Sequence, residues 1–250
     1  MMARWIYRNS ERIQAQHFNR CLELGSGVGE TGFTLATVLP TYLTDYKHEI
    51  LENLVYNRWM NDTDPEDKVE SPAQAEFTRA AGLIAKNAKI SHLDWFSPAD
   101  PTVPEAAPGG PHLLPPGVQE LQLDPLDRSK GSFDLISGSE LSYCLETVDT
   151  LAATVDHFLS PNGVFIHICS RFRGDGPHRL YLKLEQLGYK IEARPAPLWL
   201  YEGLQEKEQR ERGEEYLLWT CTCGDRDFFF GDEGQPAVDW KGLRYELTRQ

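Results

Sequence analysis

A run of glycines behind a short apolar segment is the feature that most constrains this chain. The run reads Glu23-Leu-Gly25-Ser-Gly27-Val-Gly29, and it follows Cys21 to Leu24, which has the composition of a short strand. Residues 31–38, directly after it, have the composition of a helix. Glycines at two-residue spacing let a backbone turn tightly after a strand and approach a ligand closely. The order of strand, glycine loop and helix therefore predicts an α/β fold with a nucleotide-type ligand site at this turn.

The rest of the sequence alternates between predicted strands and predicted helices. Further strands are expected at 40–45, 88–93, 133–137, 163–169 and 216–222, and helices at 47–59, 72–85, 146–159, 177–187 and 204–212. This alternation is typical of a mostly parallel sheet with helices on both faces. We therefore expect a Rossmann-like three-layer α/β sandwich.

Length and composition favour one domain over 1–250 with two insertions. At 250 residues and 40% hydrophobic content the chain can bury a substantial core. The first insertion is expected at about 62–87 and the second at about 97–130. The stretch 97–116 holds seven prolines and two adjacent glycines, which cannot continue a helix or a strand. It is predicted to be a long, mobile surface loop.

Charge and cysteine content narrow the partners and the compartment. The formal net charge of −13 repels phosphate backbones, so nucleic acid is an unlikely partner and a basic protein surface a better one. Five cysteines sit mostly in apolar runs and form no metal-ligand spacing, which predicts a reducing compartment and no metal site. No apolar run approaches the 18 or so residues that span a bilayer, and no signal peptide is evident. We expect a cytoplasmic protein with no membrane association, with the nucleus as a second compartment, and its oligomeric state stays open.

Asp45 is the second candidate ligand residue. It falls 20 residues after Gly25, at the end of the second predicted strand, where a carboxylate can accept hydrogen bonds from both hydroxyls of a ribose. The alternative interpretation is that Asp45 caps the helix that follows. A dinucleotide-binding loop would read G-x-G-x-x-G. The spacing G-x-G-x-G behind an acid favours an adenosine-type cofactor and disfavours a dehydrogenase.

Five segments together resemble a known family. They are Leu22-Glu-Leu-Gly-Ser-Gly-Val-Gly29, Leu43-Thr-Asp45 with Leu51-Glu-Asn53 and Asn57, Leu93-Asp-Trp95, Phe133-Asp-Leu-Ile-Ser-Gly-Ser-Glu-Leu-Ser-Tyr143 and Leu159-Ser-Pro-Asn-Gly163. In this order, over roughly residues 20 to 190, the chain resembles class I methyltransferases and, within them, the seven-β-strand protein lysine methyltransferase family (methyltransferase family 16). The resemblance implies a seven-stranded, mostly parallel sheet with an antiparallel C-terminal strand.

The resemblance also implies a cofactor and the residues that hold it. The cofactor is S-adenosyl-L-methionine, with S-adenosyl-L-homocysteine as product. Gly25 to Gly27 cradle its methionine part, Asp45 binds the ribose, Asp94 and Trp95 embrace the adenine, and Ser139 lies beside the sulfonium. Trp95 offers a flat face and Asp94 an acceptor for the exocyclic amine. The full set of expected cofactor-binding residues is Glu23, Gly25, Ser26, Gly27, Gly29, Asp45, Tyr46, Asp94, Trp95 and Ser139.

The catalytic residues implied by the resemblance are Glu140 and Tyr143. Glu140-Leu-Ser-Tyr143 fits the family's acid-x-x-aromatic motif at the end of the fourth strand, although the family more often has aspartate at the position of Glu140. Glu140 is expected to hold and orient the lysine amine, and Tyr143 to close the channel. The expected activity is therefore S-adenosylmethionine-dependent N-methylation of lysine on a protein substrate.

Two alternatives to this activity stay open. The same scaffold can methylate a small-molecule nitrogen or a protein histidine, because the fold does not fix the acceptor. The second alternative is a catalytically inactive, methyltransferase-like binding module. Family members carry a cofactor-contacting tryptophan roughly 25 residues before the glycine loop, and Trp5 is too close to that loop to align with it. We therefore expect either a site completed in another way or an N-terminally short version.

Overall fold

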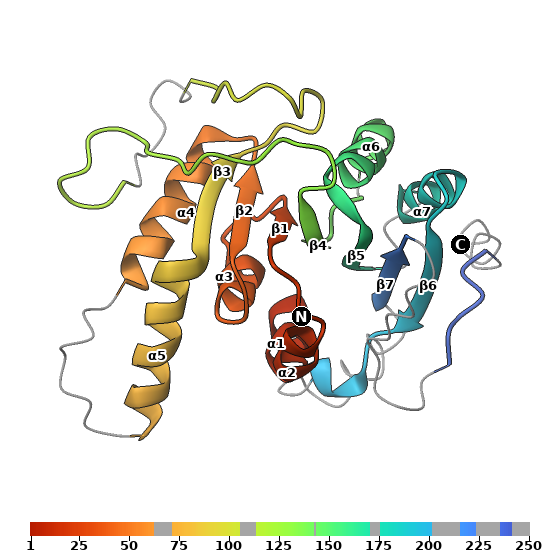
Figure 1. Ribbon diagram of the computed structural model, residues 1–250, viewed down its shortest axis with the longest axis horizontal. Helices are drawn as coiled ribbons and strands as arrows, with labels where there is room; N and C mark the ends of the chain where they lie inside the picture. The colour runs from red at the N-terminus through yellow and green to blue at the C-terminus, as the bar shows by residue number, and fades with distance from the viewer. Residues whose placement is uncertain are drawn as a thin grey trace. The chain divides into compact units, whose positions relative to one another are not determined.

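The computed structural model describes residues 1–62, 72–105, 114–142, 144–170, 176–201, 216–223 and 236–241. Its strands belong to one seven-stranded sheet of order β3-β2-β1-β4-β5-β7-β6 (Figure 1). The strands are β1 (Cys21–Leu24), β2 (Thr41–Asp45), β3 (Ala88–His92), β4 (Phe133–Ser139), β5 (Leu159–Ser170), β6 (Lys190–Pro195) and β7 (Tyr216–Thr222). β7 runs antiparallel to both β5 and β6. The predicted Rossmann-like fold with an antiparallel C-terminal strand is confirmed.

Helices flank the strands within two compact units of the chain. They are α1 (Met2–Arg8), α2 (Ser10–Ala15), α3 (Glu30–Ala36), α4 (His48–Met60), α5 (Pro72–Asn87), α6 (Val148–Phe158) and α7 (Gly176–Gln186), with short 3-10 turns η1 (Leu145–Thr147) and η2 (Leu198–Tyr201). The first unit comprises Ile6–Arg128, and the second comprises Met1–Trp5 with Ser129–Gln250. We call them the loop unit, which contains the glycine motif, and the acid unit, which contains Glu140.

Parallel strands and three helices build the core of the loop unit. β1 pairs with β2, and β2 pairs with β3 so that Leu43 lies opposite Ile90. Leu51 and Leu54 of α4 are fully buried, and with Phe33 of α3 they pack in one cluster with Leu43 and Ile90. Apolar residues on two strands and three helices thus share one hydrophobic core.

Part of the predicted second insertion is fastened to β3. The described residues from 97 to 130 contain no regular helix or strand, which the proline content predicts for 97–116. Residues 121–128, here called the edge segment, nevertheless hydrogen-bond along the strand: the Asp124 N–H donates to the Ile90 carbonyl at 2.7 Å, and the Ile90 N–H donates to Asp124 Oδ2 at 2.9 Å. Arg58 of α4 donates to the same carboxylate at 2.7 Å. This edge of β3 is therefore covered, which blocks pairing with another chain.

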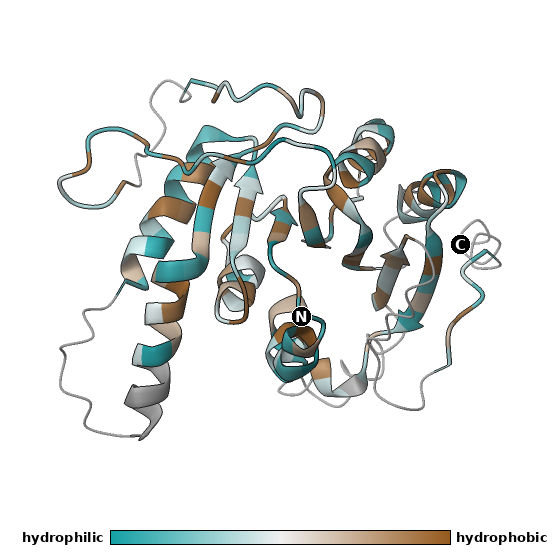
Figure 2. Cartoon of the chain, in the orientation of Figure 1, coloured by the Kyte–Doolittle hydropathy of each residue, from teal (hydrophilic) through white to brown (hydrophobic). Residues whose placement is uncertain are grey.

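The acid unit is held together by β4, β5, β6 and β7 and by a ring stack. β4 lies parallel to β5, and β7 pairs with β5 from Val164↔Thr222 to Ser170↔Tyr216. The fully buried ring of Tyr181, on α7, stacks on Trp219 of β7 with centroids 3.6 Å apart. Helices α6 and α7 carry hydrophobic and hydrophilic residues on different sides (Figure 2). Gly188, with φ 95°, follows α7 as the predicted helix terminator.

Some elements differ from the prediction or cannot be compared with it. Helices α1 and α2 and strand β6 were not anticipated, and the predicted helix at 204–212 lies outside the described residues. α5 continues directly into β3, and its Ile84 joins the core cluster of the loop unit. Among the described residues, no helix combines the length and the apolar character needed to cross a bilayer.

Candidate cofactor and active site

The glycine loop has the backbone conformation that its sequence predicts. Gly25, Gly27 and Gly29 have φ values of 60°, 53° and 85°, in the left-handed region that side chains disfavour. A Cβ at Gly27 would meet no atom within 4 Å, whereas one at Gly29 would overlap Phe33 and Leu54. The loop is therefore packed on its inner side at Gly29 and open at Gly27, where a ligand can approach the backbone.

Hydrogen bonds from β2 and α4 hold this loop in place. The Ser26 N–H donates to the Thr44 carbonyl at 2.9 Å, and the Thr44 N–H donates to Ser26 Oγ at 2.9 Å. The Thr44 hydroxyl donates to the Glu23 carbonyl at 2.6 Å. From α4, the Asn57 side-chain amide donates to the Val28 carbonyl at 3.0 Å. The loop is thus fixed before any ligand arrives, which lowers the entropy that binding costs.

Asp45 lies beside the loop and does not cap α4. Its Oδ2 accepts the Gly27 N–H at 3.3 Å, and its Oδ1 accepts the N–H groups of Tyr46 at 2.9 Å and Lys47 at 3.3 Å. Lys47 is the N-cap of α4, and the helix has no side-chain cap. The alternative interpretation of Asp45 as a helix cap is therefore wrong. Its carboxylate closes the corner between the end of β2 and the glycine loop.

Glu23 is a buried acid under the same loop. The residue is 3% exposed, and its Oε2 has no hydrogen-bond partner among the described residues. Burial raises the pKa of Glu23 to about 8, with a smaller contribution from the nearby carboxylate of Asp45 and against hydrogen bonding from Ser26 and Gly32, which lowers it. A Cβ at Gly32 would overlap both Glu23 Oε2 and Leu43. Gly32 therefore makes room for the acid, a role that the sequence prediction missed.

Asp94, Trp95 and Tyr46 lie at the carboxyl ends of β2 and β3. The Leu93 N–H donates to the Asp45 carbonyl at 3.0 Å, which brings the two strand ends together. Asp94 Oδ1 accepts the Phe96 N–H at 2.9 Å, and Trp95 is half-buried. Tyr46 is 50% exposed, and the Lys47 ammonium lies 5.5 Å from its ring centroid. No ring contact or hydrogen bond joins Trp95 to Tyr46 among the described residues, and their shared role around adenine stays a prediction.

His92 is a buried side chain near this site that the sequence prediction missed. It lies opposite Asp45 in the strand register and is 5% exposed, with neither ring nitrogen hydrogen-bonded among the described residues. Burial lowers its pKa, and the positive charge of Arg128 lowers it further, although Asp94, Asp100 and Asp45 oppose them. The ring is therefore neutral at pH 7. The signal in the sequence is its place in the predicted strand 88–93, directly before Leu93-Asp-Trp95.

The acid unit contains the other predicted site residues. Ser139 is the last residue of β4 and is half-buried. Glu140 follows with φ 58°, a left-handed conformation that is uncommon outside glycine, and its Oε1 accepts the Ser170 N–H at 2.8 Å. Tyr143 lies outside the described residues. The structure thus fixes the Glu140 carboxylate against β5, and its catalytic role stays a prediction.

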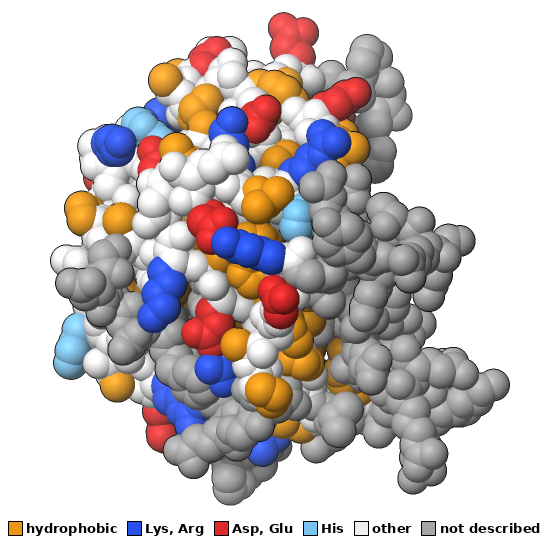
Figure 3. Space-filling model, turned by 90° about the vertical axis from the view of Figure 1, so that its right-hand side faces the viewer, with side chains coloured by type: hydrophobic (Ala, Val, Ile, Leu, Met, Phe, Trp, Pro, Cys, Tyr) orange, Lys and Arg blue, Asp and Glu red, His pale blue; other side chains and the backbone are white. Residues whose placement is uncertain are grey.

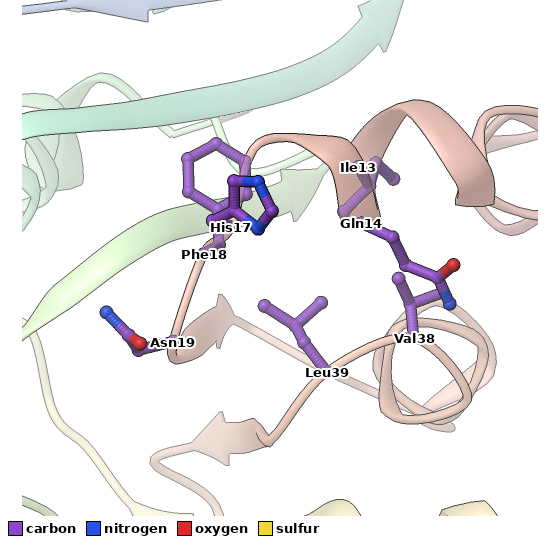
Figure 4. Close-up of a pocket in the computed structure, with 7 residues that line it drawn as sticks. All are labelled: Ile13, Gln14, His17, Phe18, Asn19, Val38 and Leu39. Atoms are coloured by element: carbon purple, nitrogen blue, oxygen red, sulfur yellow. The ribbon is translucent and has the colours of Figure 1, made fainter.

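The loop unit also contains a cavity of about 320 Å³ (Figure 4). It is lined by Ile13, Gln14, His17, Phe18, Asn19, Val38 and Leu39. Asn19 precedes β1 and Leu39 precedes β2, so the cavity is at the amino ends of these strands, opposite the glycine loop. Within the described ranges, no group of three or more His, Cys, Asp or Glu side chains could hold a metal ion.

Comparison with known proteins defines the fold. No protein-family model matches the sequence, and no curated protein matches it. Among solved structures, the glycopeptide N-methyltransferase MtfA in complex with sinefungin has a TM-score of 0.52 at 11% identity, over 87% of this chain and 86% of that one. MtfA in complex with S-adenosylmethionine has a TM-score of 0.51 at 11% identity, over 87% of each chain. The PH0226 protein from Pyrococcus horikoshii OT3 has a TM-score of 0.52 at 10% identity, over 88% of this chain and 91% of that one. This chain has the fold of class I S-adenosylmethionine-dependent methyltransferases.

Proposed function

We propose that this chain is an S-adenosylmethionine-dependent methyltransferase that N-methylates lysine on a protein substrate. The observation that carries the proposal is the left-handed glycine loop with the Asp45 carboxylate bonded to it, at the carboxyl ends of parallel strands. Open α/β sheets bind their ligands at these strand ends. MtfA, whose structures hold S-adenosylmethionine and sinefungin, supports this choice of cofactor.

The residues of the loop unit fit this cofactor chemically. The open space over Gly27 leaves room for the methionine part, and the polar edge of the loop is already oriented. Asp45 Oδ2 accepts only one hydrogen bond in the described structure, which leaves capacity for ribose hydroxyls. Glu23 places a buried carboxyl next to the loop, and the positive charge of the cofactor's ammonium group would favour its ionised form, against the burial that raises its pKa. When bound, the cofactor supplies an electrophilic methyl group on a sulfonium.

Glu140 is proposed to orient the acceptor amine. A lysine must lose its proton before its nitrogen can attack a methyl group. A carboxylate opposes that loss because it favours the ammonium form, so desolvation in the site must outweigh this effect. The hydrogen bond from Ser170 holds the Glu140 carboxylate in one orientation, which helps it align an amine. The net charge of −13 favours a basic protein as substrate.

Calorimetric titration with S-adenosylmethionine and S-adenosylhomocysteine tests the cofactor site. We expect micromolar Kd values for the wild type and at least a tenfold loss in Asp45→Ala. Asp149→Ala is the matched control, because that carboxylate is 79% exposed and pairs with Lys183 in the acid unit. It should bind like the wild type. If the intact wild type binds neither compound, the methyltransferase proposal fails.

Transfer of a radiolabelled methyl group to purified histones and ribosomal proteins tests the acceptor. After hydrolysis of the products, we expect methyl-lysine, with the yield reduced at least tenfold in Glu140→Gln. The control Glu146→Gln changes an exposed acid six residues further on and should leave the yield unchanged. Methylhistidine would replace the lysine proposal by the histidine alternative. Cofactor binding without transfer to any of these proteins would favour the binding-module alternative.

A further inference from the structure

We propose that His167 and Tyr181 are positioning residues. Their side chains form a buried hydrogen-bonded chain that holds the peptide between Glu140 and Leu141, and with it the carboxylate that orients the methyl acceptor. This inference rests on the proposed function, since it gives Glu140 a reason to be held. The chain of contacts itself belongs to the structure of the acid unit.

The contacts run from α7 through β5 to the turn after β4. The Leu141 N–H donates to His167 Nε2 at 3.2 Å, and the other ring nitrogen of His167 is hydrogen-bonded to the Tyr181 hydroxyl. His167, Tyr181 and Leu141 are 0%, 0% and 3% exposed. Water cannot replace either partner at such burial, so each hydrogen bond is needed to satisfy a buried polar group.

The donor pattern fixes the state of the imidazole. A backbone N–H can only donate, so Nε2 must be the acceptor, and the ring is neutral with its hydrogen on Nδ1. Nδ1 then donates to the Tyr181 oxygen. Burial lowers the pKa of His167 to about 3, which keeps this neutral form at all ordinary pH values. Tyr181 therefore provides the acceptor for the Nδ1 hydrogen of the tautomer that the Leu141 N–H requires.

Aromatic neighbours hold the side chains of His167 and Tyr181 in place. The Tyr181 ring stacks on Trp219 at an interplanar angle of 9°, and the His167 ring lies nearly parallel to Phe165 at 12°, with centroids 5.8 Å apart. Neither ring can rotate away without breaking its stack. The position of Nε2 is thus set by the packing of α7, β5 and β7.

The turn at Glu140 and Leu141 needs the support of these hydrogen bonds. Glu140 has φ 58°, and strained backbone of this kind persists where the surroundings determine it. Three neighbouring residues of β5 supply the bonds: the Ile168 carbonyl accepts the Glu140 N–H at 2.9 Å, His167 accepts the Leu141 N–H, and the Ser170 N–H binds the Glu140 carboxylate. The Leu141 side chain folds onto β4 where a Cβ at Gly138 would overlap it.

Three variants of His167 and its surroundings test the proposal. His167→Leu removes the acceptor, His167→Gln places an amide oxygen near the position of Nε2, and Phe158→Leu loosens the same unit's core at a fully buried residue away from the turn. The readouts are hydrogen exchange of the Leu141 amide by NMR, the Kd for S-adenosylhomocysteine, and kcat and KM for methyl transfer.

We expect His167→Leu to speed Leu141 exchange and to lower kcat, each at least tenfold, with the Kd for S-adenosylhomocysteine unchanged. His167→Gln should restore most of both losses. Phe158→Leu should lower the Tm without changing either readout. Where His167→Leu does not fold, Tyr181→Phe, which removes only the hydroxyl, should shift the His167 ¹⁵N resonances toward a tautomer mixture and lower kcat two- to fivefold.

The readouts separate this inference from the function it rests on. Unchanged Leu141 exchange in the folded His167 or Tyr181 variants overturns the inference, as does a loss of kcat no larger than that of Phe158→Leu. A wild type that transfers no methyl group overturns the proposed function alone. In that case, Leu141 exchange still decides whether His167 holds the turn.

Discussion

At the scale of single residues, Glu23 has a pKa that differs between the folded and the unfolded chain. Its burial under the glycine loop raises its pKa to about 8, so the carboxyl is largely protonated at pH 7 in the folded chain. In the unfolded chain the same group ionises near pH 4.5. Between these values the folded state binds the extra proton, so this group's contribution to stability is full below pH 4.5 and is lost as the pH rises through 8.

Glu23→Gln tests this linkage. The amide is neutral at every pH, so the variant should lack the slope of up to about 1.4 kcal/mol per pH unit that Glu23 gives between pH 4.5 and 8. Urea unfolding from pH 5 to 8.5 should therefore show Glu23→Gln gaining stability relative to the wild type as the pH rises. Glu146→Gln is the control, because its side chain is exposed. Parallel curves for wild type and Glu23→Gln would contradict the buried, protonated state.

The role of a single residue could be predicted where it depends on local backbone conformation, and not where it depends on packing against distant parts of the chain. Gly25, Gly27 and Gly29 were readable because a left-handed backbone needs glycine, and local spacing shows it. The need for glycine at position 32 comes from side chains that reach it from β1 and β2, and no local pattern records such packing. The position of Glu140 followed from the family resemblance, whereas its left-handed backbone depends on contacts with β5.

At the scale of elements, the edge segment decides whether β3 is exposed. Asp124 bonds both the strand backbone and Arg58 of α4, so one side chain joins three parts of the loop unit. Its carboxylate is 32% exposed, which weakens the ion pair but not the bond to the Ile90 N–H. The edge segment is therefore fastened mainly through Asp124.

Asp124→Ala should lower the free energy of unfolding by about 1–3 kcal/mol, because it leaves the Ile90 N–H and Arg58 without their acceptor. Chemical denaturation measures the loss, and amide exchange at Ile90 locates it. Asp127→Ala is the matched control: its pair with Arg20 is 37–38% exposed on both sides, so its removal should cost less than about 1 kcal/mol. Equal losses in the two variants would mean that Asp124 does not fasten the strand.

Helices and strands could be predicted from the sequence where their apolar residues form the hydrophobic core. β2, β4 and β7 each contribute buried apolar residues to the core and were found. β6 reads Lys-Ile-Glu-Ala-Arg-Pro, at the end of the sheet order, and its charged residues and terminal proline hid it. α1 and α2 have 7 and 6 residues. Helices this short depend on tertiary packing, which a sequence pattern does not show.

At the scale of the whole molecule, two buried groups act on stability in opposite directions with pH. His167 is neutral in the folded chain, and burial lowers its pKa from 6.5 to about 3. The unfolded chain therefore binds the extra proton between these values, and stability falls as the pH drops below 6.5. Glu23 acts in the reverse sense between pH 4.5 and 8. The two effects offset each other between pH 4.5 and 6.5.

Stability measured from pH 3 to 8.5 should rise, level off and fall. His167→Gln should flatten the acid side of this profile and Glu23→Gln the alkaline side, each by comparison with the wild type in urea unfolding. If both variants alter the same side, the assignment of these groups is wrong. On the face shown in Figure 3, acidic and basic side chains are interspersed, which reduces repulsion between like charges there. Two ion pairs, Lys183–Asp149 and Lys241–Glu185, also bring opposite charges together.

The division of the chain into two units has a consequence for its synthesis on the ribosome. Residues Met1–Trp5 group with Ser129–Gln250, and the Arg4 guanidinium donates to the Leu200 carbonyl at 3.4 Å. Ile6–Arg128, by contrast, is continuous and can complete its contacts while later residues are still being added. Trp5, which ends only 1% exposed, must therefore wait for residues beyond Arg128 before its burial is complete. During that interval a nascent chain exposes a tryptophan that a chaperone can bind.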